Sequence, residues 1–350
     1  MSIFISVLIC ELILRLFYAD EIVLFPRYHT KVKFSEYTLR MNRPDNSFYH
    51  TSVEGKWKFE INSRGFRNNR NISYEKPENT FRVLSLGDSH TLGFEVNQDE
   101  TFSFLLEKKI KENNHDAEVL NAGVSGFSTA EEYIYLINEG IKYKPDAVIL
   151  GFFNNDFDDN IKTGLFELKE DSLIAKNYEH IPGVKIQDFI YQFSLVRWLS
   201  ENSYFYSFSF NTVWNYAKQN LLKRSRENVI EYAVSLKRDF GGYQKKLAAK
   251  LIEKVYKFCL ENNVILVIAD IPALGKDGSV ISSIPLELKD TFEIYSDKLI
   301  SADKILEEVA KDKVHRAKGH RHISPETHSA IADVITNFLL TKIESKDGYK

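Results

Sequence analysis

The stretch Arg82-Val83-Leu84-Ser85-Leu86-Gly87-Asp88-Ser89-His90-Thr91 decides the fold. Its first half is an apolar run of strand type, and a helix-like pattern follows Gly87-Asp88-Ser89 directly. The Ser89 hydroxyl is therefore expected where a strand ends and a helix begins, which in open α/β sheets is the edge where ligands bind. A helix amino terminus also favours developing negative charge. A serine at this point is positioned for nucleophilic chemistry.

Segments of strand and helix type alternate from residue 81 onward. The strand-like segments are Phe81–Leu86, Glu118–Asn121, Ala147–Phe153 and Val264–Ala269. The helix-like segments are Thr101–Glu112, Glu131–Gly140, Lys246–Asn262 and Ser324–Leu340. The run from Ala147 is continuously apolar, as expected of a parallel strand buried on both faces. This alternation predicts a three-layer α/β/α domain, doubly wound and flavodoxin-like, with a parallel sheet of about five strands.

We expect three parts in the chain of 350 residues. Residues 1–19 are a membrane anchor helix, residues 20–80 a linker and small lead-in, and residues 81–345 the main domain. The lead-in is polar and irregular, with one strand-like piece at Lys56–Asn62. A largely helical insertion at about 157–243 carries the aromatic run Tyr204–Phe210 and the basic run Lys223–Arg226. This insertion is a lid, a membrane-facing surface or a plain packing subdomain.

The amino-terminal segment is apolar and is interrupted only by Glu11 and Arg15. It is shorter than the ~20 residues of a typical spanning helix. No basic residue precedes it and no small-residue cleavage site follows it, which disfavours a cleaved signal peptide. We expect a membrane anchor rather than a packed amphipathic helix. Arg27, Lys31 and Lys33 follow the segment, and the positive-inside tendency would then hold the body in the cytoplasm.

Composition excludes several classes of function. The net charge is −3 with no long basic run, which argues against a nucleic-acid partner. Cys10 and Cys259 are the only cysteines, so a disulfide framework or a Cys-based metal site is not expected. The chain contains no Gly-x-Ser-x-Gly elbow, no Gly-x-Gly-x-x-Gly pattern and no P-loop. We therefore expect no cofactor.

Four blocks follow predicted strands or lead into the last helix. They are Gly87-Asp88-Ser89, Asn121–Gly126, Asn154-Asn155-Asp156 and His320–His328. Each block alone is an ordinary turn or capping sequence. Together they supply what acyl transfer through serine requires, namely a base near the hydroxyl and donors for the oxyanion. A glycine lets a backbone N–H approach the ligand, and an asparagine amide is a neutral donor.

In this order the blocks resemble those of the SGNH (GDSL-type) hydrolase family, from about Phe81 to Leu340 apart from the insertion. The resemblance implies that Ser89 is the nucleophile and His322 the general base. It also implies that the N–H groups of Ser89 and Gly126 and the Asn155 side chain form the oxyanion hole. Asp88, His90 and Asp156 are expected to shape the substrate pocket.

The lead-in Phe59–Arg67 resembles a segment that precedes this domain in membrane-anchored bacterial members of the family. That subgroup is associated with acyl esters on envelope or exported polysaccharides. The association favours a catalytic domain outside the cytoplasm, against the weak charge signal that follows the anchor.

The fourth block departs from the family pattern. Members usually carry an Asp two or three residues before the histidine, where it orients the imidazole. Here His320 and Gly319 occupy those positions. His315, in Asp312-Lys313-Val314-His315, and His320 are weaker candidates for the base. A Ser–His dyad oriented by a carbonyl or a distant carboxylate is one outcome. A metal site among these histidines is disfavoured because no partner with ligand spacing accompanies them, and His328 is expected to pack or cap.

The sequence thus predicts hydrolysis or transfer of an acyl group, acetyl in the first instance, on a carbohydrate of the cell envelope or an exported one. An acylated carbohydrate and the membrane are the expected partners. Two alternatives stay open. One is a catalytically silent glycan-binding or assembly protein of the same fold. The other is a lipid esterase or thioesterase in which the aromatic insertion forms an acyl-chain channel.

Overall fold

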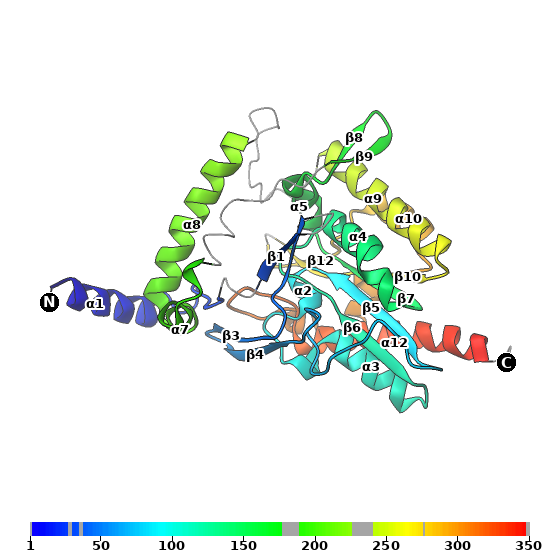
Figure 1. Cartoon of the computed structure of the whole chain (residues 1–350), viewed down its shortest axis with the longest axis horizontal. Helices are drawn as coiled ribbons and strands as arrows, with labels where there is room; N and C mark the ends of the chain where they lie inside the picture. Colours follow the sequence, from blue (N-terminus) through cyan, green and yellow to red (C-terminus); the bar gives the residue numbers. More distant parts are fainter. Residues whose placement is uncertain are drawn as a thin grey trace.

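A five-stranded parallel sheet forms the centre of the molecule (Figure 1). The computed structural model describes residues 2–26, 30–34, 38–176, 189–225, 241–275 and 277–347. The strands are β5 (Phe81–Gly87), β6 (Ala117–Asn121), β7 (Ala147–Phe152), β10 (Ile265–Asp270) and β13 (Lys298–Ile300). Their order is β13-β10-β7-β5-β6, the flavodoxin-like arrangement. The predicted fold class is confirmed, although β13 has only three residues and was too short to predict.

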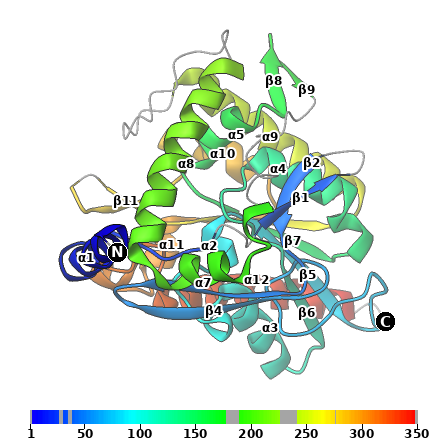
Figure 2. The same cartoon turned by 60° about the vertical axis from the view of Figure 1, so that its left-hand side comes forward.

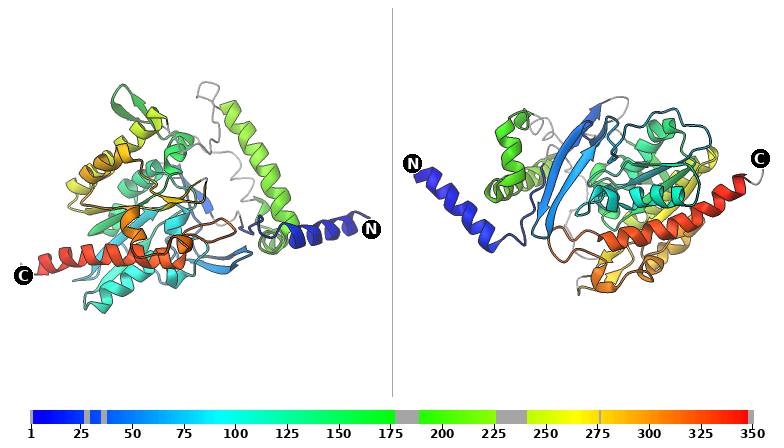
Figure 3. Two further views of the ribbon diagram at one scale, coloured as in Figure 1. Left: turned by 180° about the vertical axis from the view of Figure 1, so that it is seen from behind. Right: turned by 90° about the horizontal axis from the view of Figure 1, so that it is seen from below.

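Helices cover both faces of the sheet (Figures 1 and 3). One face carries α4 (Thr129–Asn138), α9 (Gly242–Glu261) and α10 (Leu286–Ile294). The other carries α3 (Phe102–Glu112), α11 (Ala302–Leu306) and α12 (Pro325–Asp347). Leu84 of β5 packs with the first set, whereas its neighbour Val83 packs with the second. Because successive side chains of a strand point to opposite faces, a sheet covered on both sides needs uninterrupted apolar strands.

The helix after Ser89 is a single turn. It is α2 (Ser89–Leu92), and it ends at Gly93 with a φ of 86°. The longer helix-like pattern expected here is interrupted, so its macrodipole is small and local N–H groups matter more. The remaining short elements are η2 (Gln98–Glu100), η3 (Gly140–Tyr143), η4 (Lys311–Lys313), β11 (Ala273–Leu274) and β12 (Val280–Ile281).

The lead-in is more ordered than its sequence suggested. It contains two antiparallel hairpins where one strand was expected. They are β1 (Thr30–Phe34) with β2 (Thr38–Asn42), and β3 (Asn46–Ser52) with β4 (Gly55–Ile61). Trp57 and Phe59 of β4 form an apolar cluster with Leu92 and Phe94, which follow the candidate nucleophile. The lead-in therefore packs directly against the segment that carries the predicted site.

The region of the predicted insertion combines helices with a hairpin. It contains α5 (Asp156–Thr163), β8 (Phe166–Lys169), β9 (Ser172–Ala175), α7 (Ser194–Asn202) and α8 (Tyr204–Ser225). The aromatic run Tyr204–Phe210 lies at the start of α8. Two residues named in the sequence analysis lie outside the described residues. They are Arg226, from the basic run of the insertion, and Arg27, from the basic residues that follow the predicted anchor.

The amino-terminal helix is α1 (Ser2–Phe17), and it packs against α8 (Figure 2). The Glu11 carboxylate accepts hydrogen bonds from the Ser203 hydroxyl at 2.8 Å and from the Phe205 N–H at 2.8 Å. Arg15 donates to the carbonyl of Asn202. The helix is confirmed, and both of its charged residues are engaged by the junction of α7 and α8. Among the described residues, no helix combines the length and the apolar content that crossing a membrane requires.

Candidate active site

Three of the four predicted blocks meet at one edge of the sheet. β5 lies between β6 and β7. Ser85 pairs with Asn121 of β6, and Gly87 pairs with Gly151 of β7, so all three strands end together. The strand order reverses at β5, and a crevice outside the strand ends is the usual ligand site of such sheets.

The fourth block brings a histidine to the predicted nucleophile. Nε2 of His322 lies 2.8 Å from Oγ of Ser89, although 233 residues separate them in the sequence. Ser89 is the first residue of α2, and His322 lies in the loop that leads into α12. Both side chains are half-buried. When the imidazole carries its proton on Nδ1, Nε2 accepts the hydrogen bond from the serine hydroxyl.

Two glycines allow α2 to sit against the strand ends. A Cβ at Gly87, where φ is 152°, would lie 2.0 Å from Oγ1 of Thr91. A Cβ at Gly151 would lie 2.4 Å from the same atom. The turn that presents Ser89 therefore packs on the bare backbones of β5 and β7. A larger residue at either position would clash with Thr91 and displace α2, and with it Ser89.

Asp88 joins the nucleophile turn to Asn155. Its Oδ1 accepts from the His90 N–H at 2.8 Å and thereby caps α2. Its Oδ2 accepts from Nδ2 of Asn155 at 3.1 Å. An amide nitrogen carries two hydrogens, so one N–H of Asn155 remains for an oxyanion. The N–H of Ser89 opens the helix and has no helical acceptor, which makes it a further donor.

The Gly126 loop is tied to the same strand end. The Val124 N–H donates to the Gly87 carbonyl at 3.0 Å. Gly126 has a φ of 72°, a value that favours glycine, and its carbonyl accepts from the Arg40 guanidinium of β2. Ser128 then caps α4 in a capping box with Glu131. These contacts fix the loop that carries Gly126 and tie it to the end of β5.

The three side chains that were expected to shape the substrate pocket are buried. The exposed fractions of Asp88, His90 and Asp156 are 1%, 4% and 0%. The His90 ring packs on the rings of His322 and Phe153, with centroids 4.6 Å and 4.1 Å apart. Asp156 accepts from the N–H of Thr129 at 2.7 Å. These three side chains support the site from behind rather than line it.

A group of buried carboxyls surrounds Asp88. Burial raises the pKa of Asp88 to about 6 and that of Glu131 to about 7. Burial and then the charge of Asp88 raise the pKa of Asp156, and burial and then the charge of Asp156 raise that of Glu132. The closely spaced carboxyls disfavour one another's ionisation, so part of the group is protonated near neutral pH.

Glu95 also reaches the histidine, and the sequence analysis missed it. Its Oε2 lies 3.7 Å from Nδ1 of His322. Its carboxylate also accepts the N–H groups of His320 at 3.0 Å and His322 at 3.1 Å. The Glu95 side chain is completely buried. No motif marks this residue, which is far from His322 in sequence and adopts a φ of 61°.

The competing histidines lie elsewhere. Nε2 of His315 is 2.9 Å from the Pro272 carbonyl, and the His320 ring packs on His50. His328 is buried, its Nδ1 accepts from the Phe102 N–H, and burial lowers its pKa to about 3. Of the candidate bases, His322 is the one in contact with Ser89. Across the described ranges, no group of three or more His, Cys, Asp or Glu residues could hold a metal ion.

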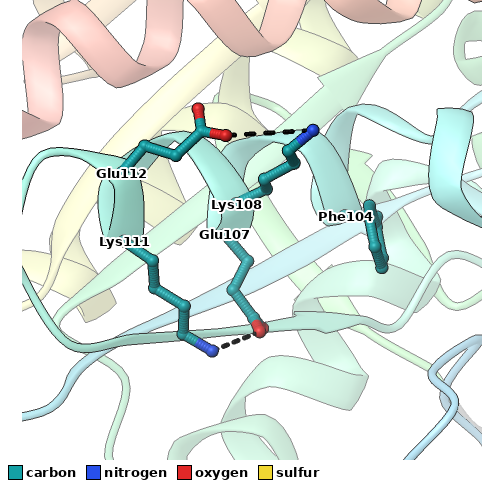
Figure 4. Close-up of a pocket in the computed structure, with 5 residues that line it drawn as sticks. All are labelled: Phe104, Glu107, Lys108, Lys111 and Glu112. Carbon is teal, nitrogen blue, oxygen red and sulfur yellow. Dashed lines mark hydrogen bonds and ion pairs between the residues drawn. The ribbon is translucent and has the colours of Figure 1, made fainter.

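A hollow of about 380 Å³ lies on the outer side of α3, away from this site. Figure 4 shows its lining, with Lys111 paired to Glu107 and Lys108 to Glu112. Such i,i+4 pairs are typical of a solvated helix face. The hollow contains no residue of the four predicted blocks.

No known family model matches the chain, and no curated protein matches its sequence significantly. Solved structures with a similar fold include a putative lipolytic protein of the G-D-S-L family from Desulfitobacterium hafniense, with 10% identity, 73% of this chain and 98% of that chain covered, and a TM-score of 0.35. The lipase/acylhydrolase from Enterococcus faecalis has 12% identity, 75% and 96% coverage, and a TM-score of 0.41. A two-domain esterase active on acetylated mannans has 13% identity, 76% and 50% coverage, and a TM-score of 0.40. Likenesses this distant decide nothing about the chemistry, which is therefore argued from the site itself.

Proposed function

We propose that this protein is a serine-dependent acyl ester hydrolase with Ser89 as nucleophile and His322 as general base. The observation that carries the proposal is the 2.8 Å contact between Oγ of Ser89 and Nε2 of His322 at the strand-order switch point. A hydroxyl held against an imidazole is the pairing that activates serine for attack on a carbonyl. The Gly126 loop and Asn155 flank the same strand end, where an oxyanion would form.

In the first half-reaction, Oγ of Ser89 bonds to the ester carbonyl carbon while its proton passes to Nε2 of His322. The N–H groups of Ser89 and Gly126 and the free N–H of Asn155 stabilise the negative charge on the former carbonyl oxygen. The bond from carbon to the alcohol oxygen then breaks, and His322 returns the proton to the departing alkoxide. This step leaves an acyl group on Ser89.

In the second half-reaction, a water molecule attacks the acyl carbon and gives its proton to His322. The bond from carbon to Oγ of Ser89 breaks, the serine regains a proton from His322, and a carboxylic acid leaves. A sugar hydroxyl in place of water would make the same step an acyl transfer.

For the substrate, we propose a short acyl group, acetyl in the first instance, on a carbohydrate of the cell envelope or an exported one. The resemblance of the four blocks and of Phe59–Arg67 to membrane-anchored SGNH hydrolases supports this class. Aromatic rings crowd the catalytic histidine, with Phe94 at 5.0 Å and His90 at 4.6 Å between ring centroids. These buried rings pack against the histidine and support its position beside Ser89.

We further propose that α1 attaches the protein to a membrane and that the catalytic domain lies outside the cytoplasm. The exposed fractions of Phe4, Leu12 and Phe17 on this helix are 69%, 57% and 75%. Glu11 and Arg15, its only charged residues, are engaged by the junction of α7 and α8. The neighbouring α7 adds Trp198, 60% exposed, and tryptophan is enriched at membrane–water interfaces. An apolar helix whose two charged residues are held by neighbouring protein groups fits a lipid surface.

The test is the substitution Ser89→Ala with His322→Ala beside it. Both variants should lose at least about 1,000-fold of the esterase activity on short chromogenic acyl esters and on O-acetylated polysaccharide. A fluorophosphonate should label Ser89 in the wild-type chain and nothing in Ser89→Ala. Wild-type chain that neither hydrolyses esters nor reacts with the reagent would favour a silent glycan-binding protein. A preference for long acyl chains would favour a lipid esterase or thioesterase.

A further inference from the structure

We propose that Glu95 is the carboxylate that positions His322, and that Gly319 is the residue whose missing side chain makes room for it. The acid would thus come from the turn behind the nucleophile rather than from the segment before the histidine. This inference rests on the proposed function, because a positioned imidazole matters only if it acts on Ser89.

The first support is the set of contacts that the Glu95 carboxylate makes with the histidine loop. One oxygen accepts the His320 N–H at 3.0 Å and the other accepts the His322 N–H at 3.1 Å. The second oxygen also lies 3.7 Å from Nδ1 of His322. Among the described residues, that ring nitrogen is buried and has no partner at hydrogen-bond distance. Catalytic hydrogen bonds are often long without substrate and shorten in the complex.

The second support is the space at Gly319, where the family pattern places an aspartate. A Cβ built on Gly319 would lie 2.2 Å from Oε1 of Glu95 and 3.0 Å from the Ser52 side chain. The φ of Gly319 is 73°, which disfavours most side chains. The Glu95 carboxylate therefore fills the volume that a side chain at residue 319 would need. A carboxylate at this place can therefore be supplied either by residue 95 or by residue 319, but not by both.

The third support is the anchoring of the turn that carries Glu95. The buried Arg67 guanidinium donates to the carbonyls of Leu92 and Val96, both at 2.9 Å, and it stacks on the Phe59 ring at 3.7 Å. Nε of Arg316, in the histidine loop, donates to the Glu95 carbonyl at 3.1 Å. Glu95 is therefore fixed from the lead-in on one side and from the histidine loop on the other.

Burial raises the pKa of Glu95, but the hydrogen bonds from His322 and from the His320 N–H outweigh it and leave the pKa below its usual value. The group is thus a carboxylate at neutral pH. A buried anion beside Nδ1 favours the tautomer with its proton on that atom, which leaves Nε2 free to accept from Ser89. It also stabilises the imidazolium that forms when the serine proton is taken.

The experiment moves the carboxylate from residue 95 to residue 319. The variants are Glu95→Ala, the double variant Glu95→Ala/Gly319→Asp, and the double variant Glu95→Ala/Gly319→Ala. The last two differ only in a carboxylate, and aspartate tolerates positive φ better than most residues. The measurements are kcat and KM on a chromogenic acetate ester and the rate of Ser89 labelling by a fluorophosphonate.

We expect Glu95→Ala to lose about 100-fold or more in kcat and in labelling rate, with KM changed less than about threefold. Glu95→Ala/Gly319→Asp should recover at least about tenfold over its alanine counterpart. The wild-type chain should show a low-field proton resonance for Nδ1 of His322, and Glu95→Ala should lack it. Recovery by relocation is not expected of a residue that only holds a loop together.

Glu107→Ala is the matched control, because Glu107 also accepts a backbone N–H, from Val119 at 2.9 Å, in addition to its ion pair with Arg70. It should lower thermal stability and leave kcat within about threefold. Equal activity of Glu95→Ala and the wild-type chain, or equal activity of the two double variants, would overturn the inference. If the wild-type Ser89 is unreactive, the proposed function itself fails, which is a different result.

Discussion

Asp88 shows how one buried side chain serves two parts of the site. It caps the single turn of α2 and holds the amide of Asn155. Capping usually stabilises a helix by about 1 kcal/mol, whereas a correctly aimed oxyanion donor affects the transition state more. The short α2 thus gains its orientation from a carboxylate that also prepares the donor next to it.

At Asn155 we expect the substitution Asn155→Ala to lower kcat by about 100-fold while KM changes little. The reason is that an oxyanion donor acts in the transition state and hardly at all on the bound ester. Steady-state kinetics on a short acyl ester measures the effect. Asn154→Ala is the neighbouring control and should stay within about threefold. A larger change in KM than in kcat for Asn155→Ala would assign this side chain to substrate binding instead.

The individual residues also mark the limit of prediction from sequence. The contact between Ser89 and His322 was predictable because each residue lies in a block with a fixed place relative to a strand or the last helix. Glu95 was not, because its contact with His322 spans 227 residues and depends on a turn held by Arg67. The inward orientation of Asp88, His90 and Asp156 was also hidden, since burial of a polar side chain is a property of tertiary packing.

At the scale of elements, long apolar strands and amphipathic helices were predicted and short or polar ones were not. β7 and β10 contain continuous apolar runs, and β5 and β6 are apolar at most positions, so their sequences sufficed. The hairpins of residues 30–61 alternate polar and apolar residues over short stretches. The β3–β4 hairpin is stabilised by packing on Phe94 and Leu92, and β2 by packing of Leu39 and Met41 in the main core. Such strands depend on their partners, and their own sequence is a weak signal.

For α1 we expect the double substitution Leu8→Glu/Leu12→Glu to reduce binding to phosphatidylcholine–phosphatidylglycerol vesicles by at least about tenfold. Both leucines are more than half exposed, and a charge at these positions opposes insertion into the lipid interface. Vesicle sedimentation measures the bound fraction. Leu286→Glu/Ile294→Glu on α10 is the control, because these two apolar residues are also exposed. Binding that is unaffected in the α1 variant, or lost equally in both, would contradict attachment through α1.

At the scale of the whole molecule, the buried carboxyls make stability depend on pH. Asp88, Asp270 and Glu131 have pKa values raised by burial to about 6, 6 and 7, and Glu132 is raised further from its usual value. A carboxyl whose pKa is higher in the folded state contributes stability that is complete at low pH. That contribution is lost as the pH rises through the folded-state pKa.

Buried histidines act in the opposite direction. Burial lowers the pKa of His90 and His328, so the unfolded chain takes up protons at these residues below about pH 6.5. Their contribution to stability is therefore lost as the pH falls and is complete above about pH 7. The net stability should pass through a maximum near neutral pH and then decline as the remaining carboxyls ionise.

We accordingly expect Glu132→Gln to raise the melting temperature relative to the wild-type chain, by a margin that grows from pH 6 to pH 8. Glutamine is uncharged and removes the cost of ionising a buried carboxyl whose oxygens have no partner among the described residues. Differential scanning calorimetry across this range measures the margin. Glu287→Gln on the surface of α10 should show no such growth. A difference in melting temperature that shrinks toward pH 8 would contradict the raised pKa of Glu132.

The position of Glu95 has a consequence for how the site forms during folding. Ser89 and Glu95 lie on one short segment, so the proposed nucleophile and the proposed acid are close in sequence, and Arg67 and Arg316 hold the turn that carries Glu95. Only the proposed base, His322, comes from a distant part of the chain. Assembling the three groups therefore needs the closure of one long loop rather than two, and its entropy cost is incurred once. A chain that has formed β5 and its turn holds two of the three groups already. Docking of the segment before α12 then adds His322, the third of the proposed groups, to a site that is already partly assembled.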